Sequence, residues 1–311
     1  MSDYKLSICI PTFNRAEYIN ELLKSIVCQD LQGVEVVVSD NASTDNTCDV
    51  LALYAKKYAN IKYSLSETNL GADLNYFRAV EMASGEYCWI IGSDDCLDAG
   101  AIKFVLNVLS TNKDIYLQDR VQHNIKMEFP KRETWWKKEV SAEWDFSKDR
   151  PSDYFSQCIS LGGVFSYLSS IVFRHDKWDS HIAPEKYYST AYSHVYTLLS
   201  ILKDRGTLTL LQGSGVLNRG GNDSFLDGGA CQRRLIDFEG YKMLSEDLEL
   251  TGLEEVLRCE HNVKTSSALF LGCLPFKSAC AYMKRAGFND YEIWLSFILS
   301  FIRRLLSLFK H

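Results

Sequence analysis

Short apolar runs and helical stripes alternate along the first 120 residues of the chain. Runs rich in β-branched and aromatic residues predict five strands, at residues 6–10, 34–38, 61–65, 87–91 and 115–117. Between these runs, apolar residues recur every three to four positions, which predicts helices. Strands and helices that alternate in this way indicate an α/β fold, in which helices flank a mostly parallel sheet.

Polar turns follow three of these strands at their carboxyl ends. They are the turns of Pro11 and Thr12, of Asp40 and Asn41, and of Ser93, Asp94 and Asp95. Because the carboxyl ends of parallel strands meet at one edge of a sheet, these side chains are expected to lie together, where such sheets bind ligands. The first turn reads IPTFNR and lacks the GxGxxG pattern, so we expect nucleotide binding without the dinucleotide fingerprint.

Two adjacent carboxylates, Asp94 and Asp95, end the fourth predicted strand. They repel each other unless a divalent cation bridges them to a phosphate. The alternative is a solvated loop or a helix cap, because Asp98 and Gly100 follow closely. The polar turns expected at the same edge favour the cation site.

The alternation weakens after residue 120. Residues 121–150 carry many charges and three tryptophans, Trp135, Trp136 and Trp144, which predicts a surface insertion or flap. The tryptophans either cover a pocket or hold the loop by packing, and packing is the favoured interpretation.

Two candidate residues follow further along the chain. The segment 160–173 begins with glycine and hydroxyl residues that allow a ligand close to the backbone, and it ends as a strand. A helix is expected at 191–202, with His194 near its start. Arg219 precedes two glycines, and an arginine in such a turn is suited to binding phosphate.

Residues 227–311 are predicted to form a helical C-terminal subdomain that follows a catalytic domain of residues 1–226. Its segment 293–309 is dense in apolar residues. On a helix, its polar residues form one stripe: Ser296, Ser300, Arg303 and Ser307. At about 1.5 Å per residue this segment is shorter than the hydrocarbon core, which favours a helix lying in the membrane interface. A helix docked on the subdomain or in a dimer is the alternative.

The composition limits which partners and which cellular compartment are expected for this protein. A net charge of −6 gives no basic footprint, so nucleic acid is not expected as a partner. The ten cysteines include no CxxC pair and several lie in apolar runs, which indicates reduced thiols in a cytoplasmic protein. The N-terminus lacks the apolar core of a signal peptide.

In this order, the turns resemble the glycosyltransferase family 2 pattern on the Rossmann-like GT-A fold. The resemblance is carried by CIPTFNR (9–15), VVVSDNASTDNT (36–47), NLG (69–71) and GEYCWIIGSDD (85–95), the last at the place of the family's DxD motif. This broad likeness covers residues 5–120.

A narrower likeness, over most of residues 1–240, is to the abequosyltransferases of bacterial O-antigen synthesis. The segments that carry it are DIYLQDR (114–120), CISLGGVFSYLSSIVF (158–173), AYSHVYTLLS (191–200) and GGNDSF (220–225).

The family resemblance implies roles for the matching residues. Pro11 and Thr12 would line the nucleobase and ribose, and Asp40 would accept a hydrogen bond from the base. Asp94 would face the ribose or a metal, and Asp95 would ligate Mg²⁺ or Mn²⁺ held against the diphosphate. The other donor-site residues implied are Asn41, Gly71, Ser93 and Arg219, with Arg219 closing on the phosphates.

Two positions depart from the family's pattern. The DxD motif reads Ser93-Asp94-Asp95, so its first carboxylate is missing. Leu74 stands where related sequences carry an arginine for the diphosphate, which increases the importance expected of Arg219.

Inverting members of the family place a carboxylate near the start of the helix where this chain has Ser193 and His194. A histidine titrates near neutral pH, so His194 is the candidate catalytic base. An extra metal ligand or a capped helix residue are the alternatives. If the linkage forms with retention, no base is required here.

The resemblance implies a metal-dependent glycosyltransferase of O-antigen (lipopolysaccharide) biosynthesis that transfers abequose from CDP-abequose to a mannose. The acceptor would be an undecaprenyl-diphosphate-linked oligosaccharide, and the enzyme would be peripheral on the cytoplasmic face of the membrane. A UDP-, dTDP- or GDP-sugar as donor is the alternative within the class. The incomplete DxD motif leaves open a non-catalytic domain that binds glycan or lipid.

Overall fold

The computed structural model of the chain describes residues 4–213, 215–222, 229–260, 266, 274–285 and 287–308. The chain divides into two compact units: Met1–Asp149 with Phe165–Asn222, and Arg150–Val164 with Asp223–His311. The segment Arg150–Val164 thus belongs with the C-terminal helices. The predicted boundary between residues 226 and 227 lies outside the described residues and stays a prediction.

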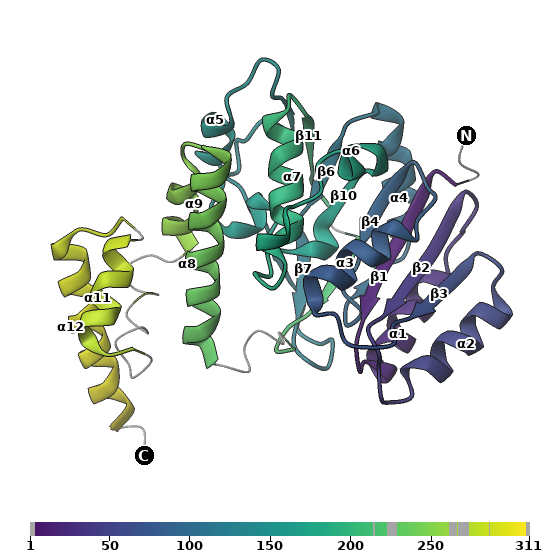
Figure 1. Cartoon of the computed structure of the whole chain (residues 1–311), viewed down its shortest axis with the longest axis horizontal. Coiled ribbons are helices and arrows are strands. Elements are labelled where there is room, and N and C mark those ends of the chain that lie inside the picture. Colours follow the sequence, from purple (N-terminus) through teal and green to yellow (C-terminus); the bar gives the residue numbers. More distant parts are fainter. Residues whose placement is uncertain are drawn as a thin grey trace. The chain divides into compact units, whose positions relative to one another are not determined.

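The first unit is built on an eight-stranded sheet with the order β3-β2-β1-β4-β10-β6-β11-β9 (Figure 1). Its strands are β1 (Leu6–Thr12), β2 (Val34–Asp40), β3 (Ile61–Leu65), β4 (Tyr87–Ile90), β6 (Ile115–Gln118), β9 (Glu143–Asp145), β10 (Ile171–Arg174) and β11 (Thr207–Leu211). Neighbours among β1 to β4 are parallel, whereas β10 is antiparallel to both β4 and β6. The predicted α/β fold with a mostly parallel sheet is confirmed.

A second, four-stranded sheet has the order β5-β12-β7-β8. Its strands are β5 (Cys96–Leu97), β7 (Arg120–His123), β8 (Lys131–Glu133) and β12 (Val216–Arg219). The predicted insertion at 121–150 therefore contributes strands to both sheets, which its charged sequence did not indicate. Trp135 and Trp136 are buried, in agreement with the packing interpretation.

Helices cover both faces of the large sheet. Alternate residues of β1, such as Leu6, Ile8 and Ile10, form one apolar core with α1 (Ala16–Val27), α2 (Thr47–Lys57) and α4 (Ala101–Val108). On the opposite face, α3 (Ala72–Glu81) and α6 (His175–Asp179) contact strands of the sheet, and α7 (Ser193–Lys203) packs against these two helices. Short 3₁₀ helices lie at Leu109–Thr111, Leu168–Ser170 and Glu185–Tyr187.

The described part of the second unit is helical, as predicted. It contains α5 (Pro151–Phe155), a 3₁₀ turn (Leu161–Val164), α8 (Gly229–Leu248), α9 (Leu253–Glu260), α11 (Phe276–Arg285) and α12 (Asp290–Leu308). The hydroxyl of Tyr241 on α8 donates a 2.9 Å hydrogen bond to the carbonyl of Val164. This bond ties the segment Arg150–Val164 to the C-terminal helices.

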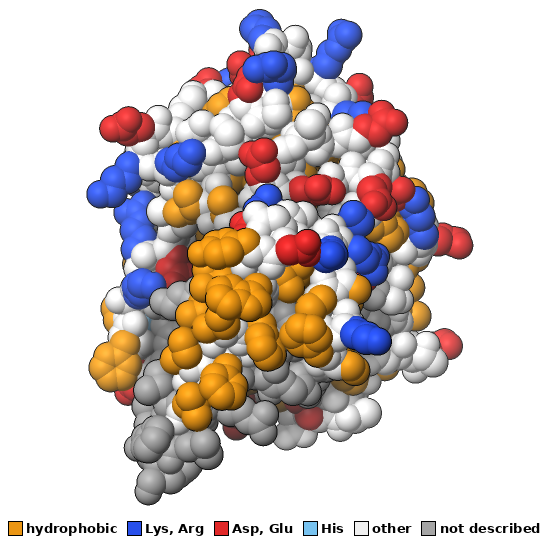
Figure 2. All heavy atoms as spheres, turned by 90° about the vertical axis from the view of Figure 1, so that its left-hand side faces the viewer, with side chains coloured by type: hydrophobic (Ala, Val, Ile, Leu, Met, Phe, Trp, Pro, Cys, Tyr) orange, Lys and Arg blue, Asp and Glu red, His pale blue; other side chains and the backbone are white. Residues whose placement is uncertain are grey.

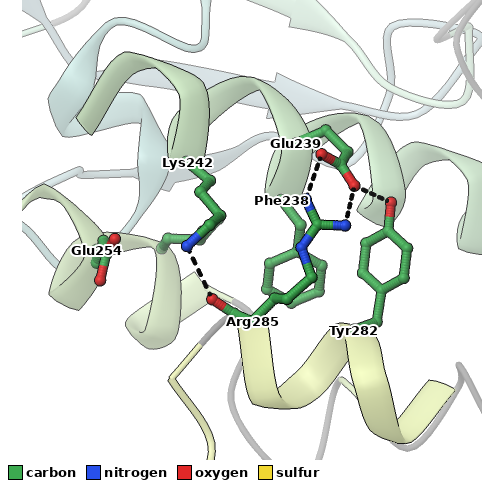
Figure 3. A pocket seen from close by; sticks show the side chains of 7 residues that line it. Phe238, Glu239, Lys242, Glu254, Tyr282 and Arg285 are labelled. Atoms are coloured by element: carbon green, nitrogen blue, oxygen red, sulfur yellow. Dashed lines mark hydrogen bonds and ion pairs between the residues drawn. The ribbon is translucent and has the colours of Figure 1, made fainter. Parts of the chain in front are cut away.

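A small pocket lies among α8, α9 and α11 (Figure 3). Its polar side chains bind one another: Glu239 accepts a 2.7 Å hydrogen bond from Tyr282 and pairs with Arg285 at 3.1 Å. Lys242 donates to the carbonyl of Arg285 at 3.3 Å. These bonds join α8 to α11, so these polar side chains of the pocket hold the two helices together.

Helix α12 carries the predicted polar stripe, in which two serines are buried and Arg303 is exposed. Ser296 and Ser300 of the predicted stripe are buried, and the Ser300 hydroxyl donates to the carbonyl of Phe297 at 2.6 Å. Six large apolar residues of α11 and α12, here called the apolar patch, are exposed instead: Phe276, Trp294, Phe297, Phe301, Ile302 and Leu305. Figure 2 shows hydrophobic side chains gathered on one face of the molecule.

Among the residues that the structure describes, none of the helices has the length and apolar character needed to cross a membrane.

Candidate active site

The carboxyl ends of β1 and β2 lie side by side, with Thr12 opposite Asp40. Asn75 of α3 fastens them together. Its Nδ2 donates to the carbonyls of Thr12 at 3.3 Å and Ser39 at 3.1 Å, and its Oδ1 accepts from the Ser39 hydroxyl at 2.7 Å. The predicted convergence of the polar turns is therefore observed, and it depends on a buried amide that sequence reasoning did not single out.

Asp40 is buried at the end of β2, where its Oδ1 accepts hydrogen bonds from the N–H and the hydroxyl of Ser43. Pro11 and Thr12 are buried at the end of β1. The Thr12 hydroxyl has no hydrogen-bond partner among the described residues. Such a buried hydroxyl costs about 1–3 kcal/mol, so a ligand that bonds to it would be favoured. The nucleobase and ribose contacts of these residues stay predictions.

Asn41 shapes the turn that precedes α3. Its Nδ2 donates to Oδ1 of Asn69 at 2.9 Å and to the carbonyl of Gly71 at 3.1 Å, while its Oδ1 accepts from the N–H of Leu70 at 2.8 Å. Gly71 has a φ of 85°, which side chains larger than glycine rarely adopt. Asn41 and Gly71 thus hold the edge of the site in shape.

Asp95 follows β4 and is almost completely buried, with 2% exposure. Its Oδ2 accepts hydrogen bonds from the hydroxyls of Tyr167 and Ser169, both at 2.6 Å. Its Oδ1 accepts from Nδ2 of Asn218 at 3.0 Å and from the N–H of Arg219 at 3.1 Å. Four uncharged donors from two distant segments thus hold this carboxylate in one orientation.

Tyr167 is itself held by Arg120 and by Trp135 of the predicted insertion. The guanidinium of Arg120 lies 4.8 Å from the ring centre of Tyr167 and 5.0 Å from that of Trp135. Trp135 donates from Nε1 to the carbonyl of Gln118 at 2.6 Å, and Arg120 pairs with Glu133 at 2.9 Å. The sequence reasoning missed this cluster, because the sequence does not show that the guanidinium of Arg120 lies between two rings.

Asp94 differs from its neighbour, because it is only partly buried. Burial and the adjacent charge of Asp95 raise the pKa of Asp94 to about 6, whereas the charge of Arg15 and a 2.8 Å hydrogen bond from Asn222 oppose the rise. Ser93 is buried beside the pair. The two predicted carboxylates are thus together at the strand end and repel each other.

The carboxylate pair fits a hard divalent cation. No cluster of three or more His, Cys, Asp or Glu side chains suited to a metal occurs among the described residues. Mg²⁺ is usually bound by one or two carboxylates together with substrate phosphates, so two carboxylates are a sufficient protein contribution. Burial, and after it the neighbouring charge of Asp95, raises the pKa of Asp94, and a bound cation would offset the second of these causes.

Arg219 is buried, and its guanidinium binds groups of the protein itself. Nε donates to the carbonyl of Asp94 at 2.9 Å, Nη1 donates to the carbonyl of Ile125 at 2.8 Å, and Nη2 forms an ion pair with Glu21. The guanidinium also lies 4.9 Å from the ring centre of Tyr18. Its predicted contact with phosphate stays a prediction. Residues 223–225 of the GGNDSF segment lie outside the described residues.

His194 lies in the first turn of α7 and has 2% exposure. Its Nε2 is 3.0 Å from the carbonyl of Phe165, to which it donates, so the lone pair of the neutral ring is on Nδ1. Burial lowers the pKa of His194 to about 4, against the opposing charge of Asp73. Nδ1 has no hydrogen-bond partner among the described residues.

Asp73 is a further residue that the sequence did not single out. Its Oδ2 accepts from the N–H groups of Ser189 and Ala191, each at 2.9 Å, and its Oδ1 accepts from the hydroxyl of Ser193. Ser189 and Ala191 have positive φ values of 84° and 69°. Asp73 therefore fixes the strained approach to α7 and with it the position of His194.

The sheet order, the carboxylate pair after β4 and the polar turns of β1 and β2 define an α/β protein with a candidate site at the carboxyl ends of its parallel strands. The model of glycosyl transferase family 2 matches residues 7–171, and the chain belongs to this family. It is a glycosyltransferase, which decides against the non-catalytic alternative.

The chain is 38% identical over 250 residues to the abequosyltransferase RfbV of Salmonella typhimurium, an alignment that covers 78% of this chain and 74% of the relative. Among solved structures, it resembles S. aureus TarS 1-349, with a TM-score of 0.57, 20% identity, and coverage of 97% of this chain and 91% of the other. It also resembles the mannosyltransferase PcManGT of Pyrobaculum calidifontis in complex with GDP-Man and Mn²⁺, with a TM-score of 0.55, 15% identity, and coverage of 97% and 87%. These structural likenesses confirm the GT-A fold.

Proposed function

We propose that the enzyme transfers abequose from CDP-abequose to a mannose of a lipid-linked oligosaccharide, as a step of O-antigen biosynthesis. The observation that carries the proposal is the 38% identity to the Salmonella abequosyltransferase, which extends over 78% of this chain. That length takes the similarity beyond the residues 7–171 that the family model matches. It therefore includes segments outside the part that the whole family shares.

In the proposed reaction, an acceptor hydroxyl oxygen bonds to C1 of the donor sugar. The bond between C1 and the diphosphate oxygen breaks, and the nucleoside diphosphate leaves with the bonding electron pair. Pro11, Thr12 and Asp40 would bind the nucleoside at the ends of β1 and β2. The Thr12 hydroxyl is suited to this role because it is buried and has no bonding partner in the described part of the chain.

Asp94 and Asp95 would hold Mg²⁺ or Mn²⁺, which would neutralise the charge that develops on the leaving diphosphate. The protein's contribution is to hold the two carboxylates in place. The four neutral donors to Asp95 fix its orientation. Asp94 is the more accessible of the two and would be the first to reach the cation.

His194 is the proposed base that takes the proton of the acceptor hydroxyl. Because the pKa of His194 is lowered, the imidazole is neutral at physiological pH, and its Nδ1 lone pair is available as a proton acceptor. The ring of Tyr76 on α3 lies 5.8 Å from that of His194 and contacts the proposed base edge to face. For His194→Ala we expect turnover to fall by about 10²-fold or more. If transfer proceeds with retention, this role is not required.

The apolar patch would bind the enzyme to the membrane surface that carries the lipid-linked acceptor. Its aromatic rings suit the interface between lipid headgroups and acyl chains, and the exposed Arg303 beside them suits anionic lipid. The buried serines of α12 support this proposal, because a helix docked by its apolar face would hide the rings instead. We therefore propose a peripheral enzyme on the cytoplasmic leaflet.

A different nucleotide sugar is the second candidate, because a structure with the same fold was solved with GDP-Man. The test is thermal stabilisation by CDP, UDP, dTDP and GDP, each with Mn²⁺ and with EDTA. A ligand at 100 times its Kd stabilises the folded protein by about 2.7 kcal/mol. We expect CDP with Mn²⁺ to give the largest shift, and a larger shift with UDP or GDP would favour the second candidate.

A further inference from the structure

The donor-binding edge contains a second arginine besides Arg219. All three guanidinium nitrogens of Arg219 bind groups of the protein, namely the carbonyls of Asp94 and Ile125 and the carboxylate of Glu21. A phosphate bound by Arg219 would have to displace these partners. The diphosphate of a nucleotide sugar therefore needs another cation, and Arg15 is at the same edge.

The backbone of Arg15 is fixed by the loop that follows β2. Its N–H donates to the hydroxyl of Thr47 at 3.1 Å, and the N–H of Ala16 donates to Oδ2 of Asp45, also at 3.1 Å. Arg15 thereby starts α1 directly after β1. The polar turns of β1 and β2 hold this position without any help from the arginine side chain.

No anion from the described part of the chain is bound to the side chain of Arg15. Its guanidinium lies 5.8 Å from the ring centre of Tyr18, the ring that also faces Arg219. Among the described residues, none accepts a hydrogen bond from this guanidinium or forms an ion pair with it. Arg219, which faces the same Tyr18 ring, donates from Nε to the carbonyl of Asp94 at 2.9 Å. The shared ring therefore places Arg15 on the side of the site where the carboxylates lie, with its planar set of donors not used by the described residues.

We propose that Arg15 binds the diphosphate of the nucleotide-sugar donor, while Arg219 holds the two carboxylates in place. Arg15 follows β1 and the carboxylates follow β4, and these two strands are parallel neighbours. A guanidinium forms paired hydrogen bonds with phosphate oxygens that a lysine ammonium cannot form. The inference rests on the proposed function, because it takes a nucleoside diphosphate as the ligand.

The test is calorimetric titration of CDP, UDP, dTDP and GDP, and of the matching monophosphates, with Mn²⁺ present. The variants are Arg15→Gln, Arg15→Lys and a control, Lys24→Gln, which removes one exposed positive charge from the same helix. We expect Arg15→Gln to weaken the best nucleoside diphosphate by about 10- to 100-fold, as loss of a hydrogen-bonded charge pair predicts. The Kd of the matching monophosphate should change by less than about threefold in Arg15→Gln. Lys24→Gln should bind both nucleotides with the affinity of the wild type.

Two results would overturn the assignment of Arg15. One is binding of the diphosphate by Arg15→Gln within about twofold of the wild type, and the other is an equal loss for monophosphate and diphosphate. Partial recovery in Arg15→Lys would support the assignment. If the wild-type chain binds none of the four diphosphates, the proposed function fails together with this inference. If the wild type binds a diphosphate tightly and Arg15→Gln binds it equally well, only the assignment of Arg15 fails and the proposed function stands.

Discussion

The hydroxyl of Tyr167 donates a 2.6 Å hydrogen bond to Oδ2 of Asp95, across a separation of 72 residues. The ring of Tyr167 lies against the guanidinium of Arg120, whose other ring neighbour is Trp135. A proposed metal ligand is therefore oriented by a tyrosine that contacts both Arg120 and a tryptophan of the predicted insertion. Groups that orient metal ligands typically change metal affinity or activity by 10- to 100-fold when they are removed.

Tyr167→Phe should raise the Mn²⁺ concentration needed for half-maximal activity by about 10-fold. The ring stays between its neighbours, so the melting temperature should change little. Tyr54→Phe is the matched control, because it removes a hydroxyl that bonds to Asn20, away from the site. An unchanged Mn²⁺ dependence in Tyr167→Phe would show that the hydroxyl does not act through Asp95.

Asp95→Ala should abolish transfer and also lower the free energy of unfolding, by about 2–3 kcal/mol. The loss of stability is expected because four donors lose their acceptor, although repulsion of Asp94 is relieved at the same time. Urea denaturation and a transfer assay measure the two effects, with the exposed Asp98→Ala as control. Full transfer activity in Asp95→Ala would contradict the proposed metal role.

The pKa of His194 makes stability depend on pH. In the unfolded chain the imidazole takes up a proton near its ordinary pKa of 6.5, whereas in the folded chain it does so only at about 4. The unfolded state therefore binds more protons between these values, and the free energy of unfolding should fall as the pH falls from about 6.5 to 4. In His194→Gln this part of the pH dependence should be absent. Equal slopes in the two proteins would mean that His194 is not buried as described.

Replacing two rings of the apolar patch should release the enzyme from lipid. For Trp294→Ser/Phe301→Ser we expect at least a 10-fold weaker partition onto vesicles that contain anionic lipid, measured by flotation. Leu53→Ser/Ile182→Ser is the control, since both residues are exposed and apolar but lie elsewhere. Unchanged flotation together with a smaller solution mass would instead assign the patch to a dimer.

Local patterns were sufficient to predict the strands β1 to β4 and the helices between them. Each of these strands is a short run such as Val34–Asp40, and each helix has an apolar stripe that needs no distant partner to be recognised. The polar turns at their ends could be placed together for the same reason, because the carboxyl ends of parallel strands share an edge.

The partners inside the site could not be predicted, since they depend on contacts between distant segments. Arg219 precedes two glycines in the sequence, as a phosphate-binding arginine would, but its guanidinium is taken up by groups from three other segments. Asp73 and Asn75 are ordinary helix residues in sequence, and only the fold makes one hold α7 and the other hold β1 and β2. Two serines of the predicted stripe on α12, Ser296 and Ser300, are buried, and their burial could not be predicted because it depends on neighbouring segments.

The central claim is that the enzyme uses CDP-abequose. The most direct measurement is transfer from CDP-abequose, compared with UDP-, dTDP- and GDP-sugars, to a lipid-linked acceptor that ends in mannose, with Mn²⁺ or EDTA. The proposed function predicts turnover with CDP-abequose that is at least about 10²-fold above every other donor and that EDTA abolishes. Faster transfer from a UDP- or GDP-sugar, or full turnover in EDTA, would contradict it.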